Sequence, residues 1–187
     1  MQSLRNTRIR PRGWALAVPV VPIVLAATAA AAAPPAHSAE VTATFAPPSV
    51  YRTHAAVTYD GRSVPEGSRV QVVESPSGKG GDAGNVTFVT LRVWGLGPNK
   101  RYDAYVYTRR CGATPAAAGR RTQAGPSREH YPQNEIWLNF TTNRRGAGTA
   151  RVGQYWLFNL MPGQASSVVI HSPVTKARAA CVTVPFT

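Results

Sequence analysis

The sequence predicts an all-β fold, an eight-stranded antiparallel Greek-key barrel or sandwich. Three observations support this prediction. Short segments with alternating apolar and polar residues follow one another at close spacing, turn-forming glycine, proline and asparagine residues separate many of them, and no helical pattern appears beyond residue 48. Several short strands with this spacing are typical of antiparallel sandwiches and barrels.

The first 39 residues have the order of regions found in secretory signal peptides. Four arginines and no acidic residue precede an apolar run at residues 14–33, and small residues follow it up to Ala39. A run of about twenty apolar residues could also be retained as a membrane anchor. Pro19 and Pro22 interrupt it, which favours a cleaved signal peptide at residues 1–39. We therefore expect a secreted or cell-envelope protein with no stable membrane span after cleavage.

Residues 40–187 are strongly basic. The whole chain has 21 lysines and arginines and 8 aspartates and glutamates, and four of the arginines lie in the predicted signal peptide, which leaves 17 basic side chains and a formal charge of +9. This positive charge would favour binding of an extracellular polyanion. The sequence shows no motif for specific recognition of nucleic acid. The best candidates for such contacts are Arg109, Arg110, Arg120 and Arg121. Plain solubility would account for the charge equally well, and the oligomeric state is left open.

Residues 40–48 are predicted to be a linker or a frayed first strand, since this segment is short and contains two prolines. Residues 49–187 form the predicted β domain. Its eight strands are expected at residues 50–59, 69–74, 85–96, 101–108, 134–142, 149–158, 166–171 and 180–186. In the third of these, Thr87, Val89, Leu91 and Val93 alternate with the residues of the opposite face, which indicates a half-buried strand.

Three features surround the strand at 101–108. Tyr105 and Tyr107 share one face of it, a spacing that suits two ligands of one metal ion, but neutral phenols are weak ligands and an aromatic filler is the alternative. Residues 111–133 are a long loop rich in glycine, proline, alanine and arginine, and loops of this length are usually functional. Cys111 and Cys181 are the only cysteines, and in an exported chain they are expected to form one disulfide.

Three segments of the second half carry a resemblance to a known family. They are RYDAYVY at residues 101–107, VVIH at 168–171 and RAAC at 178–181. The first is similar to the strand that ends in His-x-His in copper/zinc superoxide dismutases, the second to the late strand that supplies the last copper-ligand histidine, and the third to the Arg-x-Ala-Cys ending. The exported bacterial branch of this family is the most similar.

The resemblance implies a superoxide dismutase-like Greek-key fold, a Cys111–Cys181 disulfide, a copper-ligand position at His171 and an anion-attracting role for Arg178. The remaining copper ligands are replaced. Tyr105 and Tyr107 stand at the positions of the first two histidines and Arg121 near that of the metal-bridging histidine. For zinc, the long loop offers only His130, which we expect to be solvated, with Asn134 and Glu135 where an aspartate motif would lie.

We therefore expect an exported superoxide dismutase-like domain that lacks a functional metal site, with its enzymatic activity left open. Copper and zinc would be its cofactors only if the family activity survives. His171 could also be an ordinary strand histidine. The alternative function is a non-enzymatic basic domain that binds extracellular polyanions. A hydrolase is not indicated, because neither Gly-x-Ser-x-Gly nor His-Glu-x-x-His occurs in the sequence.

Overall fold

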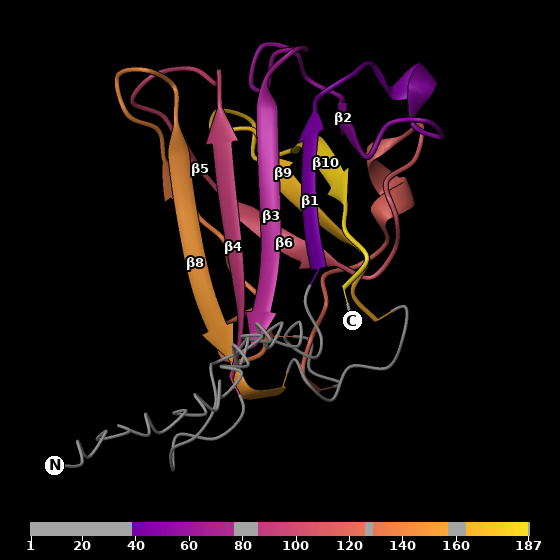
Figure 1. Cartoon of the computed structure of the whole chain (residues 1–187), viewed down its shortest axis with the longest axis vertical. Helices are drawn as coiled ribbons and strands as arrows, with labels where there is room; N and C mark the ends of the chain where they lie inside the picture. The colour runs from indigo at the N-terminus through magenta and orange to yellow at the C-terminus, as the bar shows by residue number, and fades with distance from the viewer. Residues whose placement is uncertain (1–38, 77–85, 126–128, 157–163, 187) are drawn as a thin grey trace, which may run out of the picture. The chain divides into compact units, whose positions relative to one another are not determined.

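Two four-stranded antiparallel sheets and one two-stranded sheet make up the computed structural model, which describes residues 39–76, 86–125, 129–156 and 164–186 (Figure 1). All of these residues belong to one compact unit, Pro34–Thr187. The predicted signal peptide, residues 1–39, lies outside the described residues except for Ala39. The predicted all-β class is confirmed. Within the described ranges, no helix is long and apolar enough to cross a membrane.

The first sheet has the strand order β1-β3-β4-β8. Its strands are β1 (Ala39–Thr44), β3 (Arg69–Pro76), β4 (Thr87–Trp94) and β8 (Gly148–Gln154). The prediction for residues 40–48 is a linker or a frayed first strand, and residues 39–44 form a first strand, β1. Every one of them pairs with β3, from Ala39 opposite Glu74 to Thr44 opposite Arg69.

The second sheet has the order β2-β10-β9-β6. Its strands are β2 (Ala56–Thr58), β10 (Arg178–Thr183), β9 (Ser167–His171) and β6 (Ala104–Tyr107). The small third sheet pairs β5 (Arg101–Tyr102) with β7 (Phe140–Thr141). Two short 3-10 helices complete the described elements, η1 (Pro48–Val50) and η2 (Pro115–Ala118).

The predicted strand at residues 50–59 is mostly replaced by a helical turn. Pro48 takes the first position of η1, where a proline is favoured because its missing N–H group would be unpaired in any case. The carbonyl oxygen of Val50 then accepts the backbone N–H groups of Thr53 and His54. Only residues 56–58 are left to pair as β2, at the edge of the second sheet.

The predicted strand at residues 134–142 is also short, since only β7 forms a ladder. Before β7, Glu135 and Trp137 make isolated bridges with Gln123 and Tyr105. The backbone N–H of Ala104 donates a hydrogen bond to Oδ1 of the Asn139 side chain, which here takes the place of a backbone carbonyl. This irregular segment runs beside β6 and brings Glu135 and Trp137 to the outer face of the second sheet, while Ile136 and Leu138 are buried in the main core.

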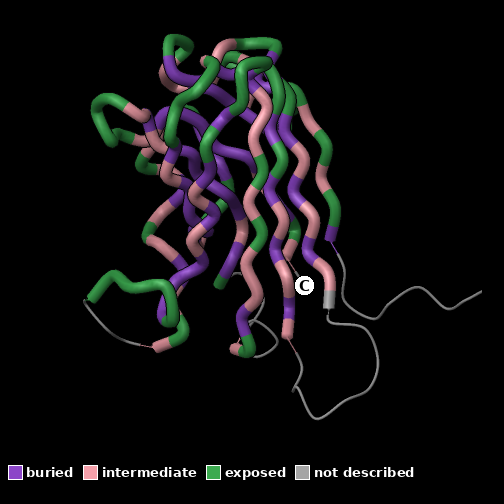
Figure 2. Tube along the Cα trace, turned by 90° about the vertical axis from the view of Figure 1, so that its left-hand side faces the viewer, coloured by how far each residue is buried: buried purple, intermediate pink, exposed green. Residues whose placement is uncertain are grey.

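The main hydrophobic core lies between the two four-stranded sheets. Thr87, Val89, Leu91 and Val93 of β4 are buried in alternation with more exposed neighbours, as predicted, and Figure 2 shows this alternation along the strands. The core also contains valine, isoleucine and alanine side chains of β3, β9 and β10. Burial of one such valine or leucine stabilises the fold by about 1.5–3 kcal/mol. The sheets are not closed into a barrel within the described residues, so the barrel form of the prediction is not found.

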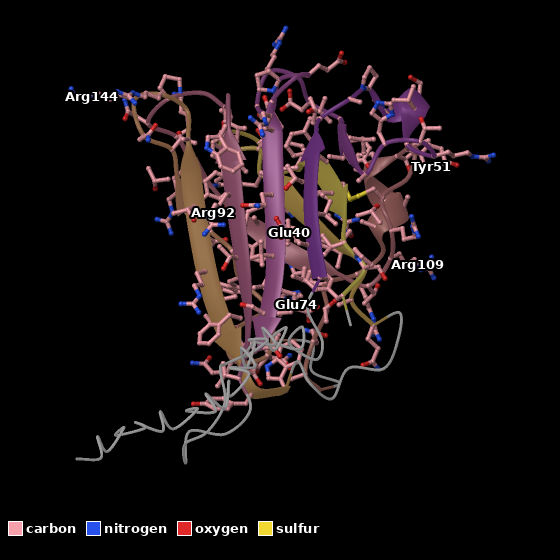
Figure 3. The ribbon with its side chains drawn as sticks, viewed as in Figure 1. Glu40, Tyr51, Glu74, Arg92, Arg109 and Arg144 are labelled. Carbon is pink, nitrogen blue, oxygen red and sulfur yellow. A yellow bond between two sulfur atoms is a disulfide. The ribbon has the colours of Figure 1, made fainter. Side chains whose placement is uncertain are left out.

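A second, smaller cluster covers the other face of the second sheet. It contains Val57, Tyr105, Tyr107, Cys111, Ala118, Val169 and Cys181. Cys111 and Cys181, which are 70 positions apart in the sequence, form a disulfide, as predicted, and its sulfur atoms are visible in Figure 3. The bond joins the start of the long loop to β10, and it is consistent with an extracellular location. The second sheet is therefore buried on both faces.

Candidate functional site

The residues at the predicted metal-ligand positions lie together on the outer face of the second sheet. Tyr105 and Tyr107 come from β6, and His171 ends the neighbouring strand β9. Successive side chains of β6 alternate, so Ala104 and Val106 join the main core while both tyrosines join the smaller cluster. The centroid of the His171 ring is 5.3 Å from that of Tyr105 and 6.3 Å from that of Tyr107.

Both ring nitrogens of His171 have hydrogen-bond partners. Nδ1 lies 2.7 Å from the carbonyl oxygen of Lys176, and because a carbonyl can only accept, Nδ1 carries the proton. Nε2 lies 3.1 Å from the hydroxyl oxygen of Tyr107 and, in this neutral tautomer, accepts a hydrogen bond from that hydroxyl. Burial lowers the pKa of His171, which favours this neutral form. The nitrogen that would coordinate a metal ion is thus engaged by a phenol.

Arg121 lies against both tyrosines. A backbone bridge pairs it with Tyr107, and its guanidinium carbon lies 3.6 Å from the centroid of the Tyr105 ring. One guanidinium nitrogen also donates to Oε2 of Glu135 at 3.0 Å. A cation over an aromatic ring contributes about 0.5–2 kcal/mol, with the larger values at desolvated sites. Arg121 is only half-buried, but both its charge and its planar face are in contact with protein groups.

Glu135 supplies the negative charge of the site. Its side chain is fully buried, and its carboxylate accepts hydrogen bonds from Arg121, from Nε1 of Trp137 at 2.9 Å and from Nδ1 of His130 at 2.5 Å. Burial alone would raise the pKa of Glu135, but these three donors outweigh it and hold the pKa below its usual value. His130 is exposed, as expected of a solvated residue, but one of its ring nitrogens also contacts this buried carboxylate, which the sequence did not predict.

Sequence analysis placed Glu135 only where the resemblance puts an aspartate motif of the zinc site, and it did not identify Trp137 at all. A signal was present, because residues 135–138 alternate between Glu135 and Trp137 on one side and the buried apolar residues Ile136 and Leu138 on the other. A carboxylate in the middle of such a segment must find a partner when it is buried. The partner, Arg121, is 14 residues away, and the pattern alone does not indicate it.

Arg178, the predicted anion-attracting residue, is at the start of β10 and is used differently. Its two terminal nitrogens donate to the carbonyl oxygens of Pro115 and Gly119, at 2.8 and 2.9 Å. Its guanidinium carbon also lies 4.5 Å from the centroid of the Tyr107 ring. These contacts attach the 3-10 helix η2 to the second sheet. The charge of Arg178 is close to the site, but its donors are engaged by the backbone of the long loop.

The donor set at these positions is a poor match for a copper or zinc ion. Such ions are held by several imidazole, thiolate or carboxylate ligands. The described positions offer two phenols and one imidazole, that of His171, and the unprotonated nitrogen of this imidazole already accepts a hydrogen bond from Tyr107. Burial raises the pKa of Tyr105, which keeps it neutral, and Arg121 would repel a dication. Among the residues that the structure describes, no three His, Cys, Asp or Glu side chains are grouped to hold a metal ion.

The four predicted polyanion-binding arginines divide into two groups. Arg109, Arg110 and Arg120 are exposed, and Figure 3 shows Arg109 at the margin of the molecule. Arg109 and Arg120 lie on adjacent segments, because the backbone N–H of Thr108 donates to the carbonyl of Arg120. Arg121 faces inward, as described above, so it is not available to an external ligand in the way that the other three are.

Five residues therefore form one connected set of contacts, which we call the tyrosine–arginine network: Tyr105, Tyr107, Arg121, Glu135 and His171. They come from β6, from the end of β9 and from two positions in and after the long loop. Within the network, Arg121 is paired with Glu135, and Nε2 of His171 with the Tyr107 hydroxyl. Lys176, Trp137 and His130 supply further hydrogen bonds from outside it. No protein-family model matches the chain, and a search of the curated proteins finds no match either.

Proposed function

We propose that this domain is a divergent superoxide dismutase-like Greek-key sandwich in which the tyrosine–arginine network takes the place of the metal centre. The support comes from position. The tyrosines of β6, the histidine of β9 and the disulfide lie where the resemblance assigns two copper ligands, a third copper ligand and the family's cysteine pair. The domain then acts as an exported, non-enzymatic protein.

One observation carries the proposal, the hydrogen bond between the Tyr107 hydroxyl and Nε2 of His171. A copper ion at His171 would have to displace this hydroxyl and would then meet the Arg121 guanidinium above Tyr105. Displacing the hydroxyl leaves the buried Tyr107 without its hydrogen-bond partner, and the loss of a hydrogen bond by a buried group costs about 1–3 kcal/mol. The network therefore competes with metal binding.

The test is a metal titration of the secreted protein. We expect less than 0.1 equivalent of copper to remain after dialysis, by elemental analysis, and no superoxide dismutation above that of free metal. His171→Ala is the matched variant and should change neither result. Retention of about one equivalent of copper with activity that His171→Ala abolishes would overturn the proposal.

A second candidate function is the binding of extracellular polyanions. It is favoured by the exposure of Arg109, Arg110 and Arg120 next to one another in a domain with excess positive charge. Contacts of this kind release counterions, so the logarithm of the affinity falls linearly with the logarithm of the salt concentration, with a slope of about −0.7 to −0.9 per neutralised phosphate.

Replacing Arg109, Arg110 and Arg120 together by serine tests this function. Binding to long-chain polyphosphate should weaken and the salt slope should flatten by about 2 units, because three charges are removed. Arg62→Ser, at an exposed position in the turn before β3, is the control. Unchanged affinity and slope in the triple variant would show that these arginines do not bind the polymer.

A further inference from the structure

The outer face of the first sheet carries a second concentration of arginines and aromatic rings. This face is turned away from the main core, and it is the side of β1, β3, β4 and β8 seen in Figure 1. Cross-strand partners share a face, so the register gives its composition. The outward-facing residues are Glu40, Thr42, Thr44, Arg69, Gln71, Val73, Ser75, Phe88, Thr90, Arg92, Trp94, Thr149, Arg151 and Gly153.

Three arginines of this face lie on a diagonal across neighbouring strands. Arg69 of β3 pairs with Trp94 of β4. Two residues along β4, Arg92 pairs with Gln71 of β3. A further two residues along β4, Thr90 pairs with Arg151 of β8, so each arginine lies one strand over and one cross-strand pair further along than the previous one. Diagonal neighbours in a sheet are about 7–8 Å apart. All three side chains are exposed, and they form a continuous line of positive charge.

Little negative charge opposes this line. Glu40 is the single carboxylate among the outward-facing residues described on these four strands. Its Oε1 accepts from Nε2 of Gln71 at 2.7 Å, and Oε1 of Gln71 accepts from a guanidinium nitrogen of Arg92 at 2.9 Å. Gln71 therefore orients Arg92 across the sheet through a neutral amide, and Arg92 keeps its other donors. Figure 3 shows Arg92 on this face.

Flat groups accompany the charges. The guanidinium carbon of Arg151 lies 3.9 Å from the centroid of the Phe88 ring, and that of Arg69 lies 5.8 Å from the Trp94 ring. Trp94 is 39% exposed, which is high for a tryptophan. A guanidinium stacked on a ring has a second planar face that points outward. Both aromatic rings and guanidinium planes are surfaces on which nucleic-acid bases stack.

A shallow hollow of about 380 Å³ lies at one end of this face. Arg92 and Trp94 line it together with Thr141 at the end of β7, Asn143 in the turn that follows, and Thr149 near the start of β8. The same turn carries Arg144, which Figure 3 shows at its tip. The hollow thus combines an indole, a guanidinium, and hydroxyl and amide groups.

We propose that this face, which we call the arginine–aromatic face, binds single-stranded nucleic acid without sequence preference. The arginine diagonal contacts phosphates, Trp94 and the stacked guanidinium of Arg151 contact bases, and the hollow receives one nucleotide. Bases of a single strand are free to stack on such groups, whereas those of a duplex are not. The proposal goes beyond the polyanion-binding function, because it names a polymer and places the contacts on a different surface from Arg109, Arg110 and Arg120.

Fluorescence anisotropy with a labelled fifteen-residue oligothymidylate tests the proposal. In the variant with Arg69, Arg92 and Arg151 replaced by serine, the salt slope should flatten by about 2 units, since a single strand gives about 0.7 per phosphate. Trp94→Ala should weaken binding about tenfold, as expected for the loss of one stacked base. Neither change should lower the melting temperature by more than a few degrees, because these side chains are at the surface.

The ligand controls separate stacking from charge. An abasic oligomer of the same length should bind less tightly than oligothymidylate, and Trp94→Ala should leave its affinity unchanged. Equal binding of the abasic oligomer, or tighter binding of an acidic polysaccharide such as polygalacturonate, would overturn the proposal. Loss of binding in the Arg109, Arg110 and Arg120 variant alone would also overturn it while leaving polyanion binding intact. Absence of all polyanion binding would overturn both.

Discussion

His171 is held in its neutral form by its surroundings. Nδ1 donates to the Lys176 carbonyl and Nε2 accepts from Tyr107. Burial lowers the pKa of the ring, and the nearby positive charges of Arg121 and Arg178 lower it further. In the unfolded chain the same ring would titrate near its ordinary value of about 6.5. The folded and unfolded states therefore bind different numbers of protons in mildly acidic solution.

This difference predicts a pH dependence of stability. Below about pH 6.5 the unfolded chain takes up a proton at residue 171 before the folded chain does, so the free energy of unfolding should fall as the pH decreases toward the lowered folded pKa. Urea unfolding at pH 7.5 and pH 5.5 measures the effect. His171→Gln should show a smaller decrease than the wild-type protein, with His54→Gln as the control. An equal decrease in all three proteins would contradict the assignment.

Glu135 is the residue on which the charges of the network depend. In Glu135→Gln the neutral amide cannot match the hydrogen bonds that the carboxylate accepts from Arg121 and His130. We expect the free energy of unfolding to fall by about 2 kcal/mol at pH 7, the scale of a hydrogen bond to a charged group. Glu66→Gln, at an exposed position, should change it by less than about 0.5 kcal/mol. A similar small loss in both would show that the network contributes little.

The contribution of Glu135 to stability at low pH gives a further check. The pKa of Glu135 is lower in the folded state, so its stabilising contribution is present above the unfolded value of about 4.3 and is lost as the pH falls through the folded pKa. Wild-type protein should lose stability in this range more steeply than Glu135→Gln, when both are followed by chemical unfolding at closely spaced pH values.

At the scale of single elements, periodicity predicted some strands well and others poorly. Strand β4 has one buried and one partly exposed face, so the alternation in its sequence indicated its orientation, while its limits, 87–94, lie two residues inside the predicted 85–96 at each end. Strands β6 and β9 are covered on both faces, so nearly all of their residues are buried. Their sequences therefore do not show which side chains face the main core and which face the tyrosine–arginine network. Whether Tyr105 and Tyr107 contact solvent, metal or protein depends on a loop whose path the local pattern does not specify.

The disulfide is an element-scale connection that sequence analysis predicted from the cysteine count and the resemblance. Cys181→Ser should lower the free energy of unfolding by roughly 4 kcal/mol, because the bond closes a loop of 70 residues in the unfolded chain. Chemical unfolding of non-reduced protein measures this, with the double variant Cys111→Ser and Cys181→Ser as a control for the free thiol. Two free thiols in wild-type protein purified without reductant, found by mass spectrometry, would contradict the pairing.

At the scale of the whole molecule, net charge is a poor guide to where ligands bind. Of the basic residues near the long loop, Arg121 and Arg178 have internal partners, whereas Arg109, Arg110 and Arg120 remain exposed. Composition could not separate these groups, because the separation depends on which segments the fold brings to Glu135 and to the carbonyls of η2. The arrangement of arginines on the first sheet became evident only from the register between strands.

The position of the disulfide also determines what a protease can release. Any single cut between Cys111 and Cys181 leaves two polypeptides joined by the sulfur bridge. When the cut lies before β9, β6 on one side of it still pairs with β9 on the other. Limited digestion within this interval should therefore give a nicked protein that migrates as one band on a non-reducing gel and as two bands after reduction. Outside the cell, where proteases are abundant and reductants scarce, such a nicked form would persist as a two-chain protein.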